Sequence, residues 1–202
     1  SSANVLLRSV VVEQTLYPTQ TVELSGTALT QGTPADGYHI ASVQVSPASI
    51  TAAGDGQALS GIEQLYLENP VDVTGATESF TVSIKVKKPS EITYLSADTV
   101  TVAVNIEPVE IFRTFDNVKL FAKGITDGLS ASLSQKTLNV VLTGPQLTLN
   151  NLRAANVTAY VDVTDLEEGE YLLPVRVRIE NGSMDGITYI ATPAGVQVTL
   201  SK

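Results

Sequence analysis

The clearest candidates for site chemistry in this sequence are two aspartates, Asp72 and Asp162, which occur in matching tetrapeptides. Each lies between two valines and two residues before a threonine, Thr74 or Thr164. Equivalent carboxylates could hold a metal ion or another ligand at the same place in two copies of a fold. One carboxylate per copy, however, cannot form the acid/base pair of a glycosidase. We therefore interpret each aspartate as an exposed acid on a strand, with the threonine beginning a turn.

The densest group of acids in the chain includes the second of these aspartates and extends just beyond it. Calcium prefers several hard oxygen ligands on a loop, so a weak surface calcium site is one interpretation. The spacing of an EF-hand loop, with its glycine and terminal glutamate, is absent. A solvated turn that leads to Gly169 is the simpler interpretation. The acids are Asp162, Asp165, Glu167, Glu168 and Glu170.

Other residues that support catalysis are scarce. The chain has no cysteine, and its single histidine, His39, has no nucleophile-elbow motif to complete a catalytic triad. We interpret His39 as a strand residue with a polar tip. The Gly54-Asp55-Gly56 segment lacks the spacing and the lysine of a phosphate-binding loop. The sequence therefore identifies no catalytic, cofactor-binding, metal-ligating or other binding residue, and we expect a protein that is not an enzyme and needs no cofactor.

Seven tyrosines are scattered along the chain, and tryptophan is missing. Carbohydrate-binding modules usually present tryptophan and tyrosine platforms, so we expect these rings mainly to pack in the core rather than form an exposed stripe. Two of them are equivalent in the repeats described below and should fill the same packing or hairpin position. The tyrosines are Tyr17, Tyr38, Tyr66, Tyr94, Tyr160, Tyr171 and Tyr189, of which Tyr94 and Tyr189 are the equivalent pair.

Charge excludes one class of partner. The formal net charge is −9, and no run of basic residues is longer than Lys87-Lys88. Nucleic-acid binding requires a basic stripe that neutralises phosphates, so we expect no nucleic-acid partner. No stretch reaches the roughly 18 apolar residues of a membrane span, so we expect no membrane insertion within this sequence. The chain starts without methionine, and we expect a fragment whose anchor or signal peptide lies outside it.

Alternating apolar and polar residues recur along the whole chain, which is typical of half-buried strands. Clear examples are Phe80–Val86, Val100–Ile106 and Val196–Leu200. Helical spacing is limited to Gln57–Tyr66 and Gln146–Ala154, each of which predicts a short helical or irregular crossover. The pattern predicts an all-β protein built from antiparallel sheets.

An internal repeat divides the chain in two. The tetrapeptide at 71–74 returns at 161–164, and the segment 92–96 returns at 187–191. Further pairs in the same order are Gly37 with Gly128, Gly54 with Gly144, and Val100–Val102 with Val196–Val198. The period is too long for a solenoid unit, so each copy should have its own core. We expect two tandem β-domains, 1–108 and 109–202, joined near 107–110.

The second repeat resembles the YbbR repeat. It has a strand that ends in glycine at 140–144, an aspartate-bearing strand at 157–163 and a Gly-x-Tyr segment that runs to a Pro-Val pair at 169–177. It closes with Pro193 and the Val196–Val198 alternation. These are features of the family pattern, and the resemblance covers nearly the whole chain from about residue 9.

The first repeat departs from the pattern. Thr77–Phe80 replaces the Gly-x-Tyr segment, no proline precedes Val82, and Ala97-Asp98 replaces Pro193-Ala194. It does have Pro34–Tyr38, which is similar to the start of many YbbR repeats.

The resemblance implies a fold and a function. YbbR repeats are small all-β domains, swapped-hairpin pseudo-barrels similar to the C-terminal domain of ribosomal protein TL5. They usually occur in tandem outside the cell, behind one N-terminal transmembrane helix, in Gram-positive bacteria. The best-known members, often called CdaR, associate with the membrane diadenylate cyclase CdaA and modulate its synthesis of cyclic di-AMP.

Two functional hypotheses follow. The first is a non-enzymatic, extracytoplasmic part of a membrane-anchored regulator, which modulates a diadenylate cyclase through protein–protein contacts with CdaA as the expected partner. The second is a cell-envelope adhesion or polymer-binding module with an immunoglobulin-like sandwich, which an exposed aromatic or calcium-binding patch would favour. The sequence does not identify the contact residues, because edge strands cannot be recognised from it.

Overall fold

The computed structural model describes residues 14, 16–24 and 29–202, and it is built almost entirely of strands. The part of the predicted first domain before residue 14 lies outside this description. The chain forms two compact units: the second contains Pro108–Lys202 with the short segment Asp36–His39, and the first contains the other described residues up to Glu107. The α-helices in the described part of the chain have five and six residues, and neither could span a membrane.

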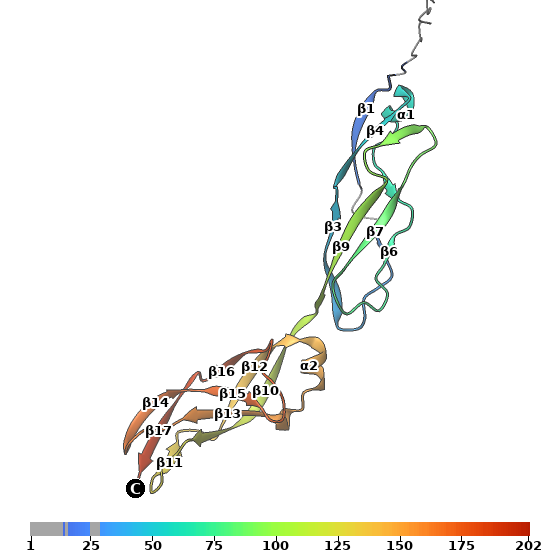
Figure 1. Ribbon diagram of the computed structural model, residues 1–202. Helices are drawn as coiled ribbons and strands as arrows, with labels where there is room; N and C mark the ends of the chain where they lie inside the picture. Colours follow the sequence, from blue (N-terminus) through green and yellow to red (C-terminus); the bar gives the residue numbers. More distant parts are fainter. Residues whose placement is uncertain (1–13, 15, 25–28) are drawn as a thin grey trace, which may run out of the picture. The chain divides into compact units, whose positions relative to one another are not determined.

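The described residues of the first unit form three small sheets. Figure 1 shows most of their strands. Strands β1, β4 and β8 form an antiparallel sheet, β3, β9, β7 and β5 form a second sheet, and the short strands β2 and β6 pair in parallel. The elements are β1 Thr19–Glu23, β2 Thr30–Gln31, β3 Tyr38–Ser46, β4 Ser49–Gly54, α1 Gly56–Ser60, β5 Tyr66–Leu67, β6 Val71–Asp72, β7 Phe80–Lys87, β8 Ile92–Leu95 and β9 Thr99–Pro108.

The second unit has two sheets around one core. The larger sheet has the order β15-β13-β10-β12-β16, and the smaller has the order β11-β17-β14. The elements are β10 Glu110–Lys123, β11 Ser130–Leu133, β12 Thr137–Pro145, α2 Gln146–Asn151, the 3₁₀ turn Ala154–Asn156, β13 Val157–Asp162, β14 Gly169–Pro174, β15 Arg176–Ile179, β16 Thr188–Thr192 and β17 Gly195–Ser201. In Figure 1 the smaller sheet lies at the end of this unit away from α2.

Strand β10 changes partner along its length. From Glu110 to Lys119 it pairs antiparallel with β12, and from Leu120 to Lys123 it pairs parallel with β13. A bulge between Phe115 and Val118 interrupts the first ladder, and Asn117 within it has a φ of 56°. Asparagine is one of the few residues that tolerate this conformation. The bulge bends β10, so that its first part pairs with β12 and its last part pairs with β13.

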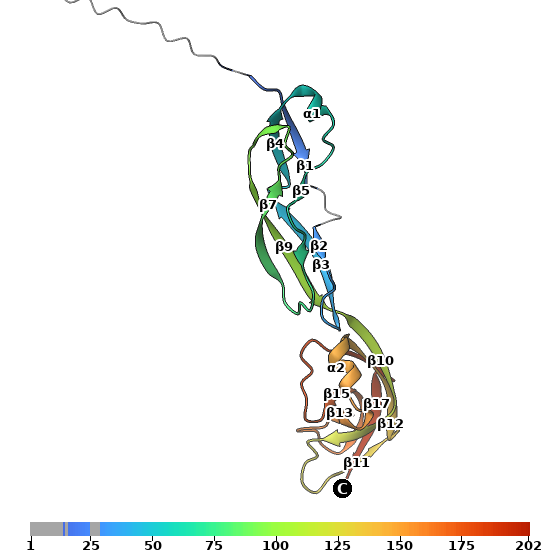
Figure 2. The same ribbon diagram turned by 90° about the vertical axis from the view of Figure 1, so that its right-hand side faces the viewer.

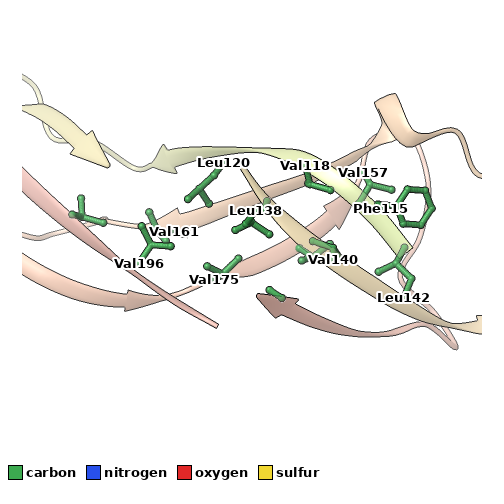
Figure 3. Packing of buried hydrophobic residues seen from close by; sticks show 14 of the residues in the cluster. Phe115, Val118, Leu120, Leu138, Val140, Leu142, Val157, Val161, Val175 and Val196 are labelled. Atoms are coloured by element: carbon green, nitrogen blue, oxygen red, sulfur yellow. The ribbon is translucent and has the colours of Figure 1, made fainter. Parts of the chain in front are cut away.

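The core of the second unit is aliphatic, with one buried phenylalanine. Val140, Leu142 and Val161 have no exposed surface, and they pack with side chains from all around the unit (Figure 3). No polar or charged side chain is buried in the described part of either unit. Burial of a Val or Leu side chain contributes about 1.5–3 kcal/mol, so each unit can be held together without a polar network.

Both predicted crossovers are present and short. Helix α1 begins after Asp55, whose carboxylate accepts a hydrogen bond from the Gln57 N–H at 2.9 Å, and it ends at Ser60, with Gly61 as its C-cap. Asp55 is therefore a helix N-cap in the glycine-rich segment. Helix α2 leads from β12 towards β13 (Figure 2). It buries Leu149.

The two units share one plan, and the all-β fold predicted from the sequence is confirmed. Two features differ from the expectation. The strands are not all antiparallel, because β2 pairs in parallel with β6 and β10 with β13. Alternation shows which face of a strand is buried but not the direction of its neighbour.

The alignment of the first repeat with the second also differs from the expectation. The ladders pair Phe80 with Val104 and Gly169 with Leu200. Val104 and Leu200 correspond, because Val100–Val102 matches Val196–Val198. Phe80 is therefore the counterpart of Gly169, and the segment in the place of Gly-x-Tyr begins at Phe80 rather than at Thr77. Val86 and Val175 correspond in the same way, since the Val86 N–H donates to Asp98 O and the Val175 N–H to Ala194 O. The proline that the first repeat lacks belongs before Val86 rather than Val82.

Candidate functional site

The repeated aspartates are engaged in the same local structure in both units. Asp162 Oδ1 accepts hydrogen bonds from the Thr164 hydroxyl at 2.6 Å and from the Thr164 N–H at 3.1 Å. Asp72 Oδ1 accepts the equivalent bonds from Thr74, at 2.6 and 2.9 Å. The carboxylate is thus an acceptor for the turn that follows its strand.

A glycine completes each of these turns. Gly32 lies against Thr74, and Gly124 lies against Thr164, with φ angles of 83° and 80°. These glycines follow the strands that pair in parallel with the aspartate-bearing strands, because Gln31 pairs with Asp72 and Lys123 pairs with Asp162. We call each Gly–Asp–Thr set a turn lock. Sequence reasoning found its Asp and Thr but missed its glycine, although Gly32 and Gly124 are themselves a matching pair.

The hydrogen bonds of the turn lock stabilise the ionised carboxylates. The Thr164 hydroxyl and then its N–H lower the pKa of Asp162 below 3.8, with smaller contributions from Lys123 and Arg176. The Thr74 hydroxyl and N–H lower the pKa of Asp72 in the same way. Hydrogen bonds to the charged form favour that form. Both acids are therefore ionised at neutral pH, and the arrangement suits a structural acceptor rather than a proton donor.

The acidic run beyond Asp162 lies on the surface. Asp165, Glu167, Glu168 and Glu170 are all exposed. The Tyr171 hydroxyl donates to the Glu167 carbonyl at 3.1 Å, which ties the turn to β14. Among residues 14, 16–24 and 29–202, no three His, Asp or Glu side chains gather as a metal-binding group. The geometry therefore gives the calcium interpretation no support.

The remaining polar candidates lie on other elements of the fold. His39 is exposed on β3, whereas Asp55 caps α1.

The tyrosines differ from the expectation. Tyr94 is 57% exposed on β8, and Tyr189 is 39% exposed on β16, so neither packs in the core. Both strands are at the edge of their sheet. Tyr17 and Tyr66 are exposed as well, whereas the other three are half-buried. The expectation of core packing was wrong for the equivalent pair, because alternation does not reveal which strand is at an edge.

Cations and aromatic rings share one face of the larger sheet of the second unit. The rings of Phe121 and Tyr160 stack with centroids 6.1 Å apart. The Arg178 guanidinium lies 5.0 Å from the Phe121 centroid, and Lys123 Nζ lies 5.4 Å from the Tyr160 centroid. Arg178 also pairs with Glu180 at 2.6 Å. Such cation–π contacts hold the cations in place over a partly apolar surface.

The outward face of β10, β12 and β16 carries a second surface, on which two large apolar side chains are exposed among threonines. Phe112 is 76% exposed and Ile190 68% exposed. Ile190 pairs with Val141 of β12, which pairs with Thr114 of β10. Exposed apolar side chains on a sheet face are a feature of interaction surfaces.

A groove opens between β10 and β11. Its cavity volume is about 810 Å³, and its walls are mostly apolar, with Leu120, Phe121 and Ala122 from β10 and Ala131 and Leu133 from β11. The remaining lining residues are Lys119, Ile125, Ser132, Lys136 and Thr137. No carboxylate is among them. We call this cavity the β10–β11 groove.

Comparison with known proteins gives consistent matches. A family model described as YbbR-like protein matches the chain twice, at residues 22–106 and 118–200. The CdaA regulatory protein CdaR of Bacillus subtilis (strain 168) is 23% identical over 150 residues, which cover 72% of this chain and 30% of that protein. The chain thus spans less than a third of the length of this relative.

Two solved structures are also similar. The YbbR-like domain of a Listeria monocytogenes protein is 22% identical with a TM-score of 0.40, and the match covers 45% of this chain and 93% of that domain. A YbbR-like protein from Streptococcus pneumoniae is 16% identical with a TM-score of 0.31, and the match covers 96% of this chain and 98% of the other.

Proposed function

Because the chain belongs to the YbbR-like protein family, we propose that it is the extracytoplasmic part of a membrane-anchored regulator and modulates a diadenylate cyclase through protein–protein contacts. In this proposal the chain is not an enzyme, and its partner is a cyclase of the CdaA type. The observation that carries the proposal is the similarity to a protein named as a regulator of CdaA.

The arrangement of polar groups supports a contact function. The carboxylates that repeat between the units are both used as acceptors within turn locks. The apolar and cationic side chains, in contrast, are presented on open sheet faces and in the β10–β11 groove. Surfaces of this kind suit recognition of another protein.

The proposal is tested with the anchored protein that carries this chain. Membranes are solubilised in a mild detergent, the tagged protein is purified, and the cyclase that co-purifies is quantified by mass spectrometry. The same measurement is made on a form in which only residues 1–202 are deleted. Cyclic di-AMP is measured in both strains.

We expect the cyclase to co-purify in larger amount with the intact protein, and cyclic di-AMP to change on deletion. Equal recovery without these residues, and an unchanged level of cyclic di-AMP, would assign the contact to the anchor and overturn a role for these units. If no cyclase is recovered with either form, the adhesion or polymer-binding hypothesis becomes the better one.

We also propose that the domain boundary lies between Pro108 and Val109. The core of the second unit is a continuous cluster drawn from Phe115–Leu200, which favours independent folding. A fragment of residues 109–202 should show dispersed amide resonances and a cooperative thermal transition. A fragment without either would place the boundary elsewhere.

A further inference from the structure

The β10–β11 groove is bordered by two strand edges that have no strand partner in the described part of the second unit. The ladder between β10 and β12 ends at the Lys119–Thr137 pair, and the last bond on that side is from the Leu120 N–H to Lys136 O, at 2.9 Å. Beyond it, β10 is paired only with β13. Strand β11 pairs with β17 and is the end strand of its sheet.

The backbone on each side of the groove is directed towards it. The Lys123 carbonyl accepts from the Val163 N–H, so it points towards β13. Backbone groups of successive strand residues point to opposite sides, and those of Ala122 therefore face the groove, as the Leu120 N–H does. On β11 the Ser134 N–H donates to Gln197 O. By the same alternation, the backbone groups of Leu133 face away from β17.

The side chains around these edges define what fits between them. The walls are apolar because they include Leu120, Phe121, Ile125 and Leu133. Ile125 is 43% exposed. Two lysines, Lys119 and Lys136, line the same groove, in a chain whose net charge is −9. A ligand with apolar groups, backbone-like hydrogen-bonding groups and a negative charge would match all three features.

We propose that the β10–β11 groove binds an extended segment of a protein partner, which adds as a strand alongside β10 and places a carboxylate near Lys119 and Lys136. Strand addition provides main-chain hydrogen bonds, and alternate side chains of the segment enter the apolar walls. The strand edges on the two sides of the groove are short: β11 has four residues, Ser130–Leu133, and β10 continues past its ladder with β12 over Leu120–Lys123. The bound segment is therefore about four to six residues long, since a strand advances by about 3.3 Å per residue.

This inference rests on the proposed function only in taking the partner to be a protein. It does not require that partner to be a cyclase. The experiment below uses no cyclase, so its outcome is separate from that of the co-purification.

The probe is a library of random ten-residue peptides displayed on phage, selected against the whole 202-residue chain. We expect convergence on peptides in which apolar residues alternate and an Asp or Glu lies near one end. The selected peptide, once synthesised, should slow hydrogen exchange of the Ala122 and Leu133 amides. Convergence on sequences without this pattern, or an absence of convergence, would overturn the proposal.

Two variants and two matched controls locate the binding. Ile125→Asp and the double variant Lys119→Glu/Lys136→Glu should each weaken binding of the peptide by roughly tenfold or more, about 1.4 kcal/mol. Leu172→Asp introduces the same charge at an exposed leucine of β14, and Lys85→Glu/Lys87→Glu reverses two exposed lysines of the first unit. Both controls should bind as the unchanged chain does.

Equal weakening in the variants and their controls would show that the peptide binds through non-specific electrostatic or hydrophobic contacts, and would overturn the proposal. Vesicles of phosphatidylglycerol provide the final arm. If they compete with the peptide in the unchanged chain and lose this effect in Ile125→Asp, the groove binds an anionic lipid and the assignment to a protein segment is wrong.

Discussion

Gly124 lies so close to Thr164 that a Cβ atom at position 124 would overlap the threonine hydroxyl. That hydroxyl is at the same time the donor to Asp162 Oδ1. Gly32 and Thr74 have the same relationship in the first unit. The chain therefore preserves three residues together in each copy, and the glycine is needed both for its conformation and for the space that it leaves.

Replacement of this glycine should separate the two requirements. Gly124→Ala should lower the free energy of unfolding of the second unit by about 2–4 kcal/mol, from left-handed strain and overpacking combined. Gly128→Ala is the control, because Gly128 has a φ of 87° but a Cβ atom added there would meet nothing within 4 Å. It should lose about 1 kcal/mol. Urea unfolding measures both, and equal losses would contradict the steric part of the argument.

The turn lock should make stability depend on pH. The pKa of Asp162 is lowered in the folded state by hydrogen bonds from Thr164. Its stabilising contribution is therefore fully present above the ordinary value of 3.8 and is lost as the pH falls through the lowered pKa. Asp162→Asn keeps an acceptor but removes the charge, so the unchanged chain should exceed this variant in stability at pH 7 and approach it near pH 3.

Unfolding curves for the two proteins at several pH values measure this difference. Thr164→Val, which removes the hydroxyl donor, should reduce the pH dependence in the same window. A stability difference between the Asp162→Asn variant and the unchanged chain that stays constant from pH 7 to pH 3 would refute the assignment.

Burial should distinguish two leucines in the same unit. Leu142 has no exposed surface, whereas Leu172 is 78% exposed. Leu142→Ala should lower the free energy of unfolding by about 2–5 kcal/mol, because it removes packed methyl groups and leaves a cavity. Leu172→Ala should change it by no more than about 0.5 kcal/mol. Denaturant unfolding of the two variants is the measurement. Similar losses in the free energy of unfolding would show that Leu142 is not packed in the core as described.

Arg113 should stabilise the connection between β12 and β13. Its Nη1 donates to Leu149 O and Leu152 O, both at 2.6 Å, at the end of α2, and its guanidinium lies 4.9 Å from the Phe115 centroid. Arg113→Met should cost about 1.5–3 kcal/mol, the range for hydrogen bonds that involve a charged group.

Arg113→Lys should recover only part of that loss, because an ammonium group lacks the planar geometry of the guanidinium. Arg153→Met, at an exposed arginine, is the matched control. Thermal unfolding ranks the three variants. A stability for Arg113→Met equal to that of the control would mean that the α2 carbonyls do not depend on this arginine.

The sequence predicted the elements better than the relationships among them. Alternation at Phe80–Val86 and Val100–Ile106 correctly predicted β7 and β9, because one face of β7 is half-buried or buried and one face of β9 is buried. The parallel pairing of β10 with β13 was not predictable in this way, since the residues that meet are distant in sequence. Nor does alternation distinguish an edge strand from a central one.

The candidate sites show the same division. Matching residues revealed Asp72 and Asp162, and the structural interpretation of both agrees with their hydrogen bonds. The β10–β11 groove could not be predicted from the sequence, because it depends on where the ladder between β10 and β12 ends rather than on any local motif. The equivalent tyrosines, Tyr94 and Tyr189, marked a common position but not its exposure.

The position of β17 determines when the smaller sheet of the second unit can form. This strand is the last of the unit, yet it is the central strand of its sheet, where Ser201 pairs with Ser130 and Leu200 with Gly169. Neither β11 nor β14 has its neighbour in this sheet until β17 is in place. The smaller sheet therefore cannot form before the final strand of the unit is available, whereas the larger sheet does not contain that strand.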